Sequence, residues 1–68
     1  MNWKEAINES KKGTATRTEE KNNKKYTTVR YKDGGGFILV SENGKVDFEN
    51  SCEADPCEMD KFTDWLPS

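Results

Sequence analysis

The 68-residue chain has 35% charged and only 31% hydrophobic residues, with a formal net charge of −2. These values predict one small domain, residues 1–68, and they exclude a large enzyme with a deep cleft of its own. Few large apolar side chains are present to offset the conformational entropy that the chain loses on folding, so a partner chain would add burial. We therefore expect a homo-oligomer.

The arrangement of charge is more informative than its sum. Residues 1–34 carry nine Lys/Arg against five Asp/Glu, whereas residues 35–68 carry two against eight. A basic half can attract phosphates, and an acidic half can repel nucleic acid or imitate it. No apolar run approaches the roughly 20 residues of a membrane span, and the N-terminus is too polar for a secretion signal. We expect a cytoplasmic protein that does not contact membranes.

The first element is expected to be a helix. Asn2 and Glu5 have the spacing of a capping box, and Trp3, Ala6 and Ile7 fall on one helical face. Gly13 is expected to end this helix. Such a short helix is not stable alone, so its Trp3 and Ile7 side must dock on another element.

Three or four antiparallel strands are expected next, arranged as a meander. Residues 14–18 predict a short edge strand, residues 19–25 (EEKNNKK) a mobile loop, and residues 26–32, 37–42 and 45–50 further strands. Asp33-Gly34-Gly35-Gly36 predicts a turn, and Asn43-Gly44 is the strongest short hairpin signal.

The Asn43-Gly44 hairpin also predicts a register. A two-residue turn places Glu42 opposite Lys45, Ser41 opposite Val46, Val40 opposite Asp47 and Leu39 opposite Phe48. Strand 37–40 is then apolar on both sides, with Val29 and Tyr31 on the side of Phe37 and Leu39. One helix covers only one side of a sheet, so the other side needs the C-terminal segment or a second protomer.

The acidic C-terminal segment is expected to form a short second helix. Asp55-Pro56 followed by Glu58 is typical of an N-cap, a proline at the first helical position and a capping carboxylate. A helix over residues 56–64 would place Met59, Phe62 and Leu66 on one side, and Pro67 would stop it. The predicted fold class is α+β, with one helix before the meander and one after it.

The residue types argue against an enzyme, a metal site or a cofactor. The chain has no histidine, and Cys52 and Cys57 are too few for a structural zinc site. The sequence offers no identifiable general base to activate a Ser or Thr nucleophile. We expect the two cysteines to be thiols in a reducing cytosol, although a disulfide closing a four-residue loop stays open.

A few residues are nonetheless candidates for ligand contact. Arg17 and Arg30 are the only arginines, and a guanidinium on a strand suits a phosphate or a carboxylate. Gly35, within the Gly34–Gly36 run, can offer backbone amides to a phosphate or serve only as a turn. Trp65 can stack on a base or anchor the core. Nucleic-acid binding through the lysines, with Tyr26 and Tyr31 as stacking platforms, is disfavoured by the acidic net charge.

Two stretches resemble a known family. Met1 to Arg17, M-N-W-x-E-A-I-x(5)-G-x-A-x-R, and the closing Thr63-Asp64-Trp65 resemble the phage Thoeris anti-defence proteins of the second type. The resemblance implies homo-oligomers that bind a cyclic ADP-ribose type signal, without catalysis, in pockets shared between protomers. It also implies Arg17, Trp65 and Asp64 as ligand contacts and the host cytoplasm as the location.

The favoured hypothesis is therefore a non-catalytic phage or mobile-element protein that sequesters a nucleotide-derived signal of host immunity. The alternative is an inhibitor of a host defence nuclease that acts by direct protein contact through its acidic half. That half contains Asp47, Glu49, Glu53, Asp55, Glu58, Asp60 and Asp64.

Overall fold

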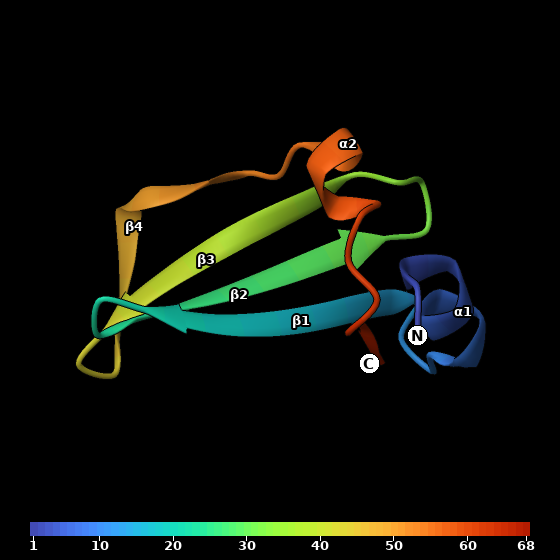
Figure 1. The fold of residues 1–68 in the computed structure, drawn as a ribbon, viewed down its shortest axis with the longest axis horizontal. Helices are drawn as coiled ribbons and strands as arrows, with labels where there is room; N and C mark the ends of the chain where they lie inside the picture. The colour runs from blue at the N-terminus through green and yellow to red at the C-terminus, as the bar shows by residue number, and fades with distance from the viewer.

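A single antiparallel sheet organises the chain. The computed structural model describes residues 1–68, with the elements α1 (Trp3–Glu9), β1 (Thr14–Lys21), β2 (Lys24–Tyr31), β3 (Gly36–Glu42), β4 (Lys45–Glu53), α2 (Pro56–Met59) and β5 (Leu66–Pro67). The strand order is β4-β3-β2-β1-β5. Strands β1 to β4 form the meander, and the C-terminal segment then crosses the sheet so that β5 pairs with β1 (Figure 1). The predicted α+β class is confirmed, with β5 as an additional strand.

Helix α1 begins with the predicted capping box. The Asn2 side chain accepts a hydrogen bond from the Glu5 backbone at 2.9 Å, and the Glu5 carboxylate accepts one from the Asn2 backbone at 3.0 Å. The helix ends at Ser10, earlier than predicted, because the Ser10 hydroxyl accepts backbone N–H groups from Lys12, Gly13 and Thr14 and turns the chain into β1.

The mobile loop predicted for residues 19–25 is wrong. These residues extend β1 and β2 into a hairpin, in which Glu20 faces Lys25 and Lys21 faces Lys24. Asn22 and Asn23 form the two-residue turn with φ values of 50° and 65°. Asparagine tolerates this left-handed region, and polar strand ends that face water need no apolar residue.

The Asn43-Gly44 hairpin is confirmed, and so are the first three pairs of its predicted register. The pairing of Leu39 with Phe48 is wrong, because β4 bulges and the next paired residue is Cys52, opposite Ile38. Ser51 stabilises the bulge by donating to the Asp47 carbonyl at 2.8 Å and accepting from the Val40 backbone at 3.1 Å. The bulge produces the sharp corner of β4 in Figure 1.

Helix α2 has the predicted Asp55 cap and Pro56 start but ends at Met59. The prediction that the helix continues to residue 64 is wrong, because the chain becomes extended after Phe62 and pairs Leu66 with Thr16. Leu66 is therefore exposed instead of lying beside Met59. Neither helix has the length and hydrophobicity that crossing a membrane would require.

The core lies entirely on one face of the sheet, which we call the covered face. It consists of Ala6, Ile7, Ala15, Ala54, Met59 and Trp65, with Trp3, Ile38 and Phe62 packed around them. Helix α2 and the C-terminal segment lie over this face, and α1 closes its end beside β1 and β5 (Figure 1). The opposite face, which we call the open face, is covered by no element. Val29 and Tyr31 lie there with Phe37 and Leu39, as predicted.

The Gly44 backbone offers a test of the hairpin. Gly44 has a φ of +80°, and no atom lies within 4 Å of the position that its Cβ would take. Gly44→Ala is therefore expected to destabilise the fold by about 1 kcal/mol through backbone conformation alone. Urea unfolding measures the loss. Gly44→Asn serves as the control because asparagine tolerates a positive φ, and an equal loss in both variants would contradict the explanation.

Candidate functional site

Two buried arginines stand on neighbouring strands of the covered face. Arg17 lies on β1 and is 8% exposed, and Arg30 lies on β2 and is 2% exposed. Arg17 pairs with Thr28 and Arg30 with Ala15, so the two guanidinium groups project from adjacent rows of the sheet. Burying a charged group is costly unless it is paired, so the partners of each arginine determine what the site can do.

Arg17 is held by the C-terminal segment. Its Nε donates to Asp64 Oδ1 at 2.8 Å and its Nη2 to Asp64 Oδ2 at 3.2 Å, a two-point geometry that only arginine provides. A third, longer bond of 3.4 Å reaches Glu19. The guanidinium carbon also lies 3.5 Å from the centroid of the Phe62 ring, an arrangement that favours a cation over the ring face.

Arg30 is held in the same way by different residues. Its Nη1 donates to Asp60 Oδ1 at 2.6 Å and its Nε to the Gly34 carbonyl at 3.0 Å. The guanidinium carbon lies 3.9 Å from the centroid of the Trp3 ring. Each arginine therefore binds one aspartate of the C-terminal segment and lies over one aromatic ring. The two ion pairs hold the segment after α2 against the sheet.

The ion pair between Arg17 and Asp64 also shifts the pKa values of both groups. The hydrogen bond from Arg17, together with its charge, holds the pKa of Asp64 below its ordinary value. Burial lowers the pKa of Arg17, but the hydrogen bond and charge of Asp64 outweigh that effect and leave the pKa raised. Both groups stay charged at neutral pH.

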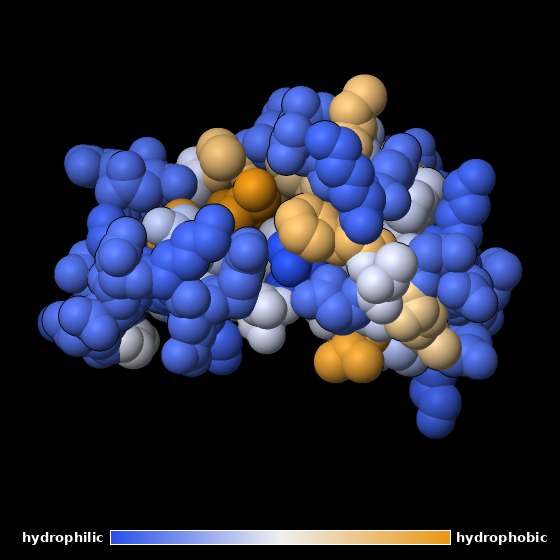
Figure 2. Space-filling view, viewed as in Figure 1, coloured by the Kyte–Doolittle hydropathy of each residue, from blue (hydrophilic) through white to orange (hydrophobic).

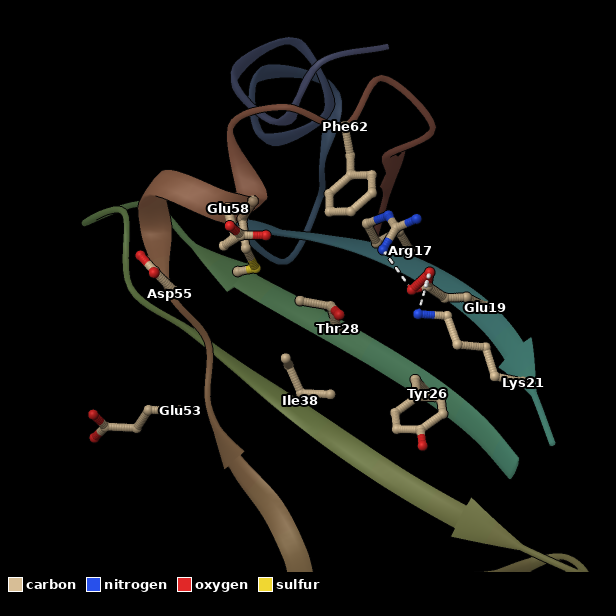
Figure 3. A pocket seen from close by; sticks show the side chains of 11 residues that line it. Arg17, Glu19, Lys21, Tyr26, Thr28, Ile38, Glu53, Asp55, Glu58 and Phe62 are labelled. Atoms are coloured by element: carbon tan, nitrogen blue, oxygen red, sulfur yellow. Dashed lines mark hydrogen bonds and ion pairs between the residues drawn. The ribbon is translucent and has the colours of Figure 1, made fainter. Parts of the chain in front are cut away.

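A hollow of about 530 Å³ opens beside Arg17 (Figure 3). Its walls come from β1, β2, β3, the end of β4 and α2, and its lining residues are Arg17, Glu19, Lys21, Tyr26, Thr28, Ile38, Glu53, Asp55, Glu58, Met59 and Phe62. In Figure 2 hydrophobic side chains gather in the middle of this face, between hydrophilic ends. The volume falls within the range of small-molecule sites.

The two sides of the hollow differ in charge. The β1 side has two cations, Arg17 and Lys21, with the carboxylate of Glu19 between them, while the α2 side has the two carboxylates of Asp55 and Glu58 (Figure 3). Glu53 points away from the centre of the hollow. The Lys21 side chain is 65% exposed and its only carboxylate neighbour, Glu19, is 3.9 Å away, so its ammonium group is free to bind an anion.

Aromatic, hydroxyl and aliphatic groups separate these charged sides. Phe62 stands next to Arg17 at one end, and Tyr26 lies at the other end of the hollow beside Lys21 (Figure 3). Thr28 and Ile38 form part of the floor between them. Such a site can hold a planar ring, hydroxyl groups that donate to carboxylates, and one or two negative charges near β1.

The predicted site residues divide between two places. Arg17 and Asp64, at opposite ends of the sequence, meet as an ion pair at the hollow. Arg30 lies beside the Gly34 turn instead. The Gly35 backbone is used by that turn, because its N–H donates to Asp33 at 2.8 Å and its carbonyl accepts from Tyr31 at 2.8 Å.

Trp65 is fully buried among core side chains, which gives it a packing role in this fold. Its indole N–H has no hydrogen-bond partner, and such an unpaired buried donor costs about 1–3 kcal/mol. The aromatic side chains at the hollow are Phe62 and Tyr26. Sequence reasoning did not select Phe62 as a site residue, because a helix over residues 56–64 accounted for it as a core position.

Four carboxylates of the acidic half form contacts within the fold. Asp60 and Asp64 neutralise the two arginines. Asp55 caps α2 through the Cys57 backbone, and Asp47 accepts hydrogen bonds from Asn50 in the β4 bulge. These carboxylates support the fold, which reduces what the acidic segment offers to a basic partner.

No three His, Cys, Asp or Glu side chains come together in a way that could hold a metal ion. Cys52 and Cys57 are both exposed thiols. Comparison with protein-family models, with characterised proteins and with solved structures gives no match for this chain. The argument for its function therefore rests on the site itself.

The Arg17–Asp64 pair makes stability depend on pH in a defined direction. Because the pKa of Asp64 is lower in the folded chain, its contribution is complete above the unfolded value of 3.8 and is lost as the pH falls through the folded pKa. Asp64→Asn is expected to cost about 1–2 kcal/mol at pH 7, because Asp64 is exposed while Arg17 is buried. Its free energy of unfolding should also fall less steeply below pH 3.8 than that of the parent chain.

Urea unfolding at a series of pH values measures both effects. Glu9→Gln is the matched control, because Glu9 lies exposed at the end of α1 and forms no ion pair with an arginine. Parallel pH profiles for Asp64→Asn and the parent would show that the pair does not carry this dependence.

Proposed function

We propose that the chain is a non-catalytic binding protein that sequesters a nucleotide-derived signal of the cyclic ADP-ribose type in the hollow beside Arg17. The observation that carries the proposal is the division of that hollow into a cationic side, an aromatic and aliphatic middle and an acidic side. A nucleotide presents the same three kinds of group, namely phosphate, planar base and ribose hydroxyls.

Each part of such a ligand has a matching group in the hollow. Lys21 suits the phosphates, because its ammonium group is exposed, and Arg17 on the same strand adds positive charge at the same side of the hollow. Phe62 and Tyr26 offer ring faces or edges to a base, and base–aromatic stacking is worth about 1–3 kcal/mol per base. The carboxylate of Glu58 can accept hydrogen bonds from a ribose diol, a pairing that dinucleotide sites also use.

The segments that resemble the Thoeris anti-defence family support the choice of ligand class. They lie far apart in sequence but form one unit, since the Met1 amino group donates to the Thr63 carbonyl at 2.7 Å and the Trp65 backbone donates to the Met1 carbonyl at 3.1 Å. Asp64 in turn bonds to Arg17, which lines the hollow. One residue of the resembling stretches thus contributes to the lining, and the others support it.

A binding role agrees better with these groups than a catalytic one. Arg17, the buried charged group of the hollow, is bonded to Asp64 outside its lining, and both groups have pKa values shifted toward their charged forms. A general acid or base needs a pKa near the working pH, which these shifts move away from. The ligand is therefore expected to leave the site unchanged.

Titration calorimetry with cyclic ADP-ribose, ADP-ribose and AMP tests the proposal. The cyclic compound is expected to bind most tightly and to be recovered intact after the protein is denatured by heat. Lys21→Ala and Tyr26→Leu are each expected to weaken binding about tenfold, the equivalent of one charge-assisted or stacking contact. Both side chains lie at the open end of the hollow, so these changes leave the buried Arg17 pair in place.

Lys11→Ala is the matched control, because Lys11 is an exposed lysine outside the hollow and its loss should leave affinity unchanged. Equal weakening by Lys11→Ala would indicate general charge attraction instead of a site. No binding of any of the three compounds at about 1 mM, together with no small molecule released from freshly purified protein, would refute the proposed function.

A further inference from the structure

The open face of the sheet differs from the covered face in its charge. Cross-strand pairing assigns each paired strand residue to one face, because directly paired residues project to the same side. Eight charged residues project to the covered face: Arg17, Glu19, Lys21, Lys24, Arg30, Glu42, Lys45 and Asp47. The open face has a continuous set of eleven uncharged positions: Thr14, Thr16, Thr18, Thr27, Val29, Tyr31, Phe37, Leu39, Ser41, Val46 and Leu66.

This segregation is unusual for such a charged chain. The open face has fourteen paired positions, of which three are charged, whereas a composition of 35% charged residues would give about five on a solvated antiparallel face, which is normally polar. The charged residues of the open face, Glu20, Lys25 and Glu53, stand at its ends and edge instead. The residues between them are β-branched, aromatic and aliphatic, the types that favour sheet packing.

Nothing in the chain shields this face. The whole core cluster lies on the other side of the sheet, and Tyr31, Val46 and Leu66 are 45%, 45% and 65% exposed. Only 10 of the 68 residues are buried, so the protomer is a sheet with one covering layer. A domain normally needs a packed layer on each apolar side of its sheet.

We propose that a second copy of this chain supplies that layer, with the two open faces packed against each other as a two-fold symmetric sandwich. The flat, uncharged surface is complementary to itself, as a two-fold interface requires. Two twisted sheets pack in this way at about 10 Å with their strands about 30° apart. The few charges at the rim, two acidic and one basic, give a lipid surface or a strongly charged protein nothing to recognise.

The size of the face is sufficient for such a dimer. Four strands about 4.8 Å apart and about six residues long span roughly 20 Å by 20 Å, within the molecule's extents of 32 × 20 × 19 Å. Two such faces bury on the order of 1,000 Å² in total, the lower end of specific interfaces. The dimer is therefore expected to dissociate on dilution.

This dimer places the two hollows on its outer sides. The hollow opens on the covered face, opposite to the contact, so each copy keeps its own site. The proposal stands independently of the proposed ligand. It differs from the pockets shared between protomers that the family resemblance implies, because here the contact and the site use opposite faces.

Sedimentation velocity across a concentration series tests the proposal with the full chain. The parent is expected to shift from one chain mass to two as concentration rises. The double variant Thr27→Lys/Leu66→Lys puts a charge in the middle and at the edge of the open face, and it is expected to raise the dissociation constant at least about tenfold. Circular dichroism confirms that the variant folds, and Leu66→Lys alone changes a residue that is already 65% exposed.

Thr63→Lys is the matched control. Thr63 is exposed in the C-terminal segment that lies over the covered face, and a lysine there should leave the dimer intact. A parent chain that remains monomeric up to about 1 mM overturns the proposal. So does a dimer that Thr63→Lys dissociates and the double variant does not, or a monomer that binds neutral lipid vesicles through the same positions.

Discussion

Two arginine–carboxylate pairs hold the segment after α2 against the sheet, and the remaining structure depends on that attachment. Arg17 binds Asp64 and Arg30 binds Asp60, and each guanidinium also lies over an aromatic ring. A chain with so few large apolar residues cannot cover its sheet with hydrophobic contacts alone, so charged side chains contribute to the packing. Because each arginine is buried and paired with an aspartate of this segment, the segment is held in one position, with Trp65 in the core and Phe62 at the rim of the hollow.

The same attachment explains why the site lies where it does. Helix α2 ends after one turn, and the chain that follows crosses the covered face on its way to β5. The hollow is the space left between this crossing segment, the corner of β4 and the strands beneath (Figure 3). Its opposite charges follow from topology, since the basic first half of the sequence supplies β1 and the acidic second half supplies α2. The charge asymmetry of the chain thus becomes a charge gradient across one site.

The covered face and the open face of the sheet differ in the contacts that they make. The covered face holds the ion pairs, the core and the proposed ligand, while the open face is free of charge except at its ends and edge. A larger domain would cover both faces with its own helices. A chain of 68 residues has enough sequence for one covering layer, so joining copies is the simplest way to shield the second face.

Local signals determined much of this fold. The Asn2–Glu5 capping box, the Asp55-Pro56 helix start and the Asn43-Gly44 turn were all predictable, because each depends on a few neighbouring residues. The sequence also indicated strand 37–40 as apolar on both sides, and the structure places Ile38 and Val40 on the covered face and Phe37 and Leu39 on the open face. Prediction from the sequence failed where contacts between distant segments override the local sequence pattern. Residues 19–25 form a hairpin because the strands that they extend pair with each other, and α2 stops early because Arg17 and β1 bind the residues beyond it. The bulge at Phe48, the burial of Trp65 and the place of Phe62 were decided only by tertiary structure, because each results from contacts between segments that no short window of sequence contains.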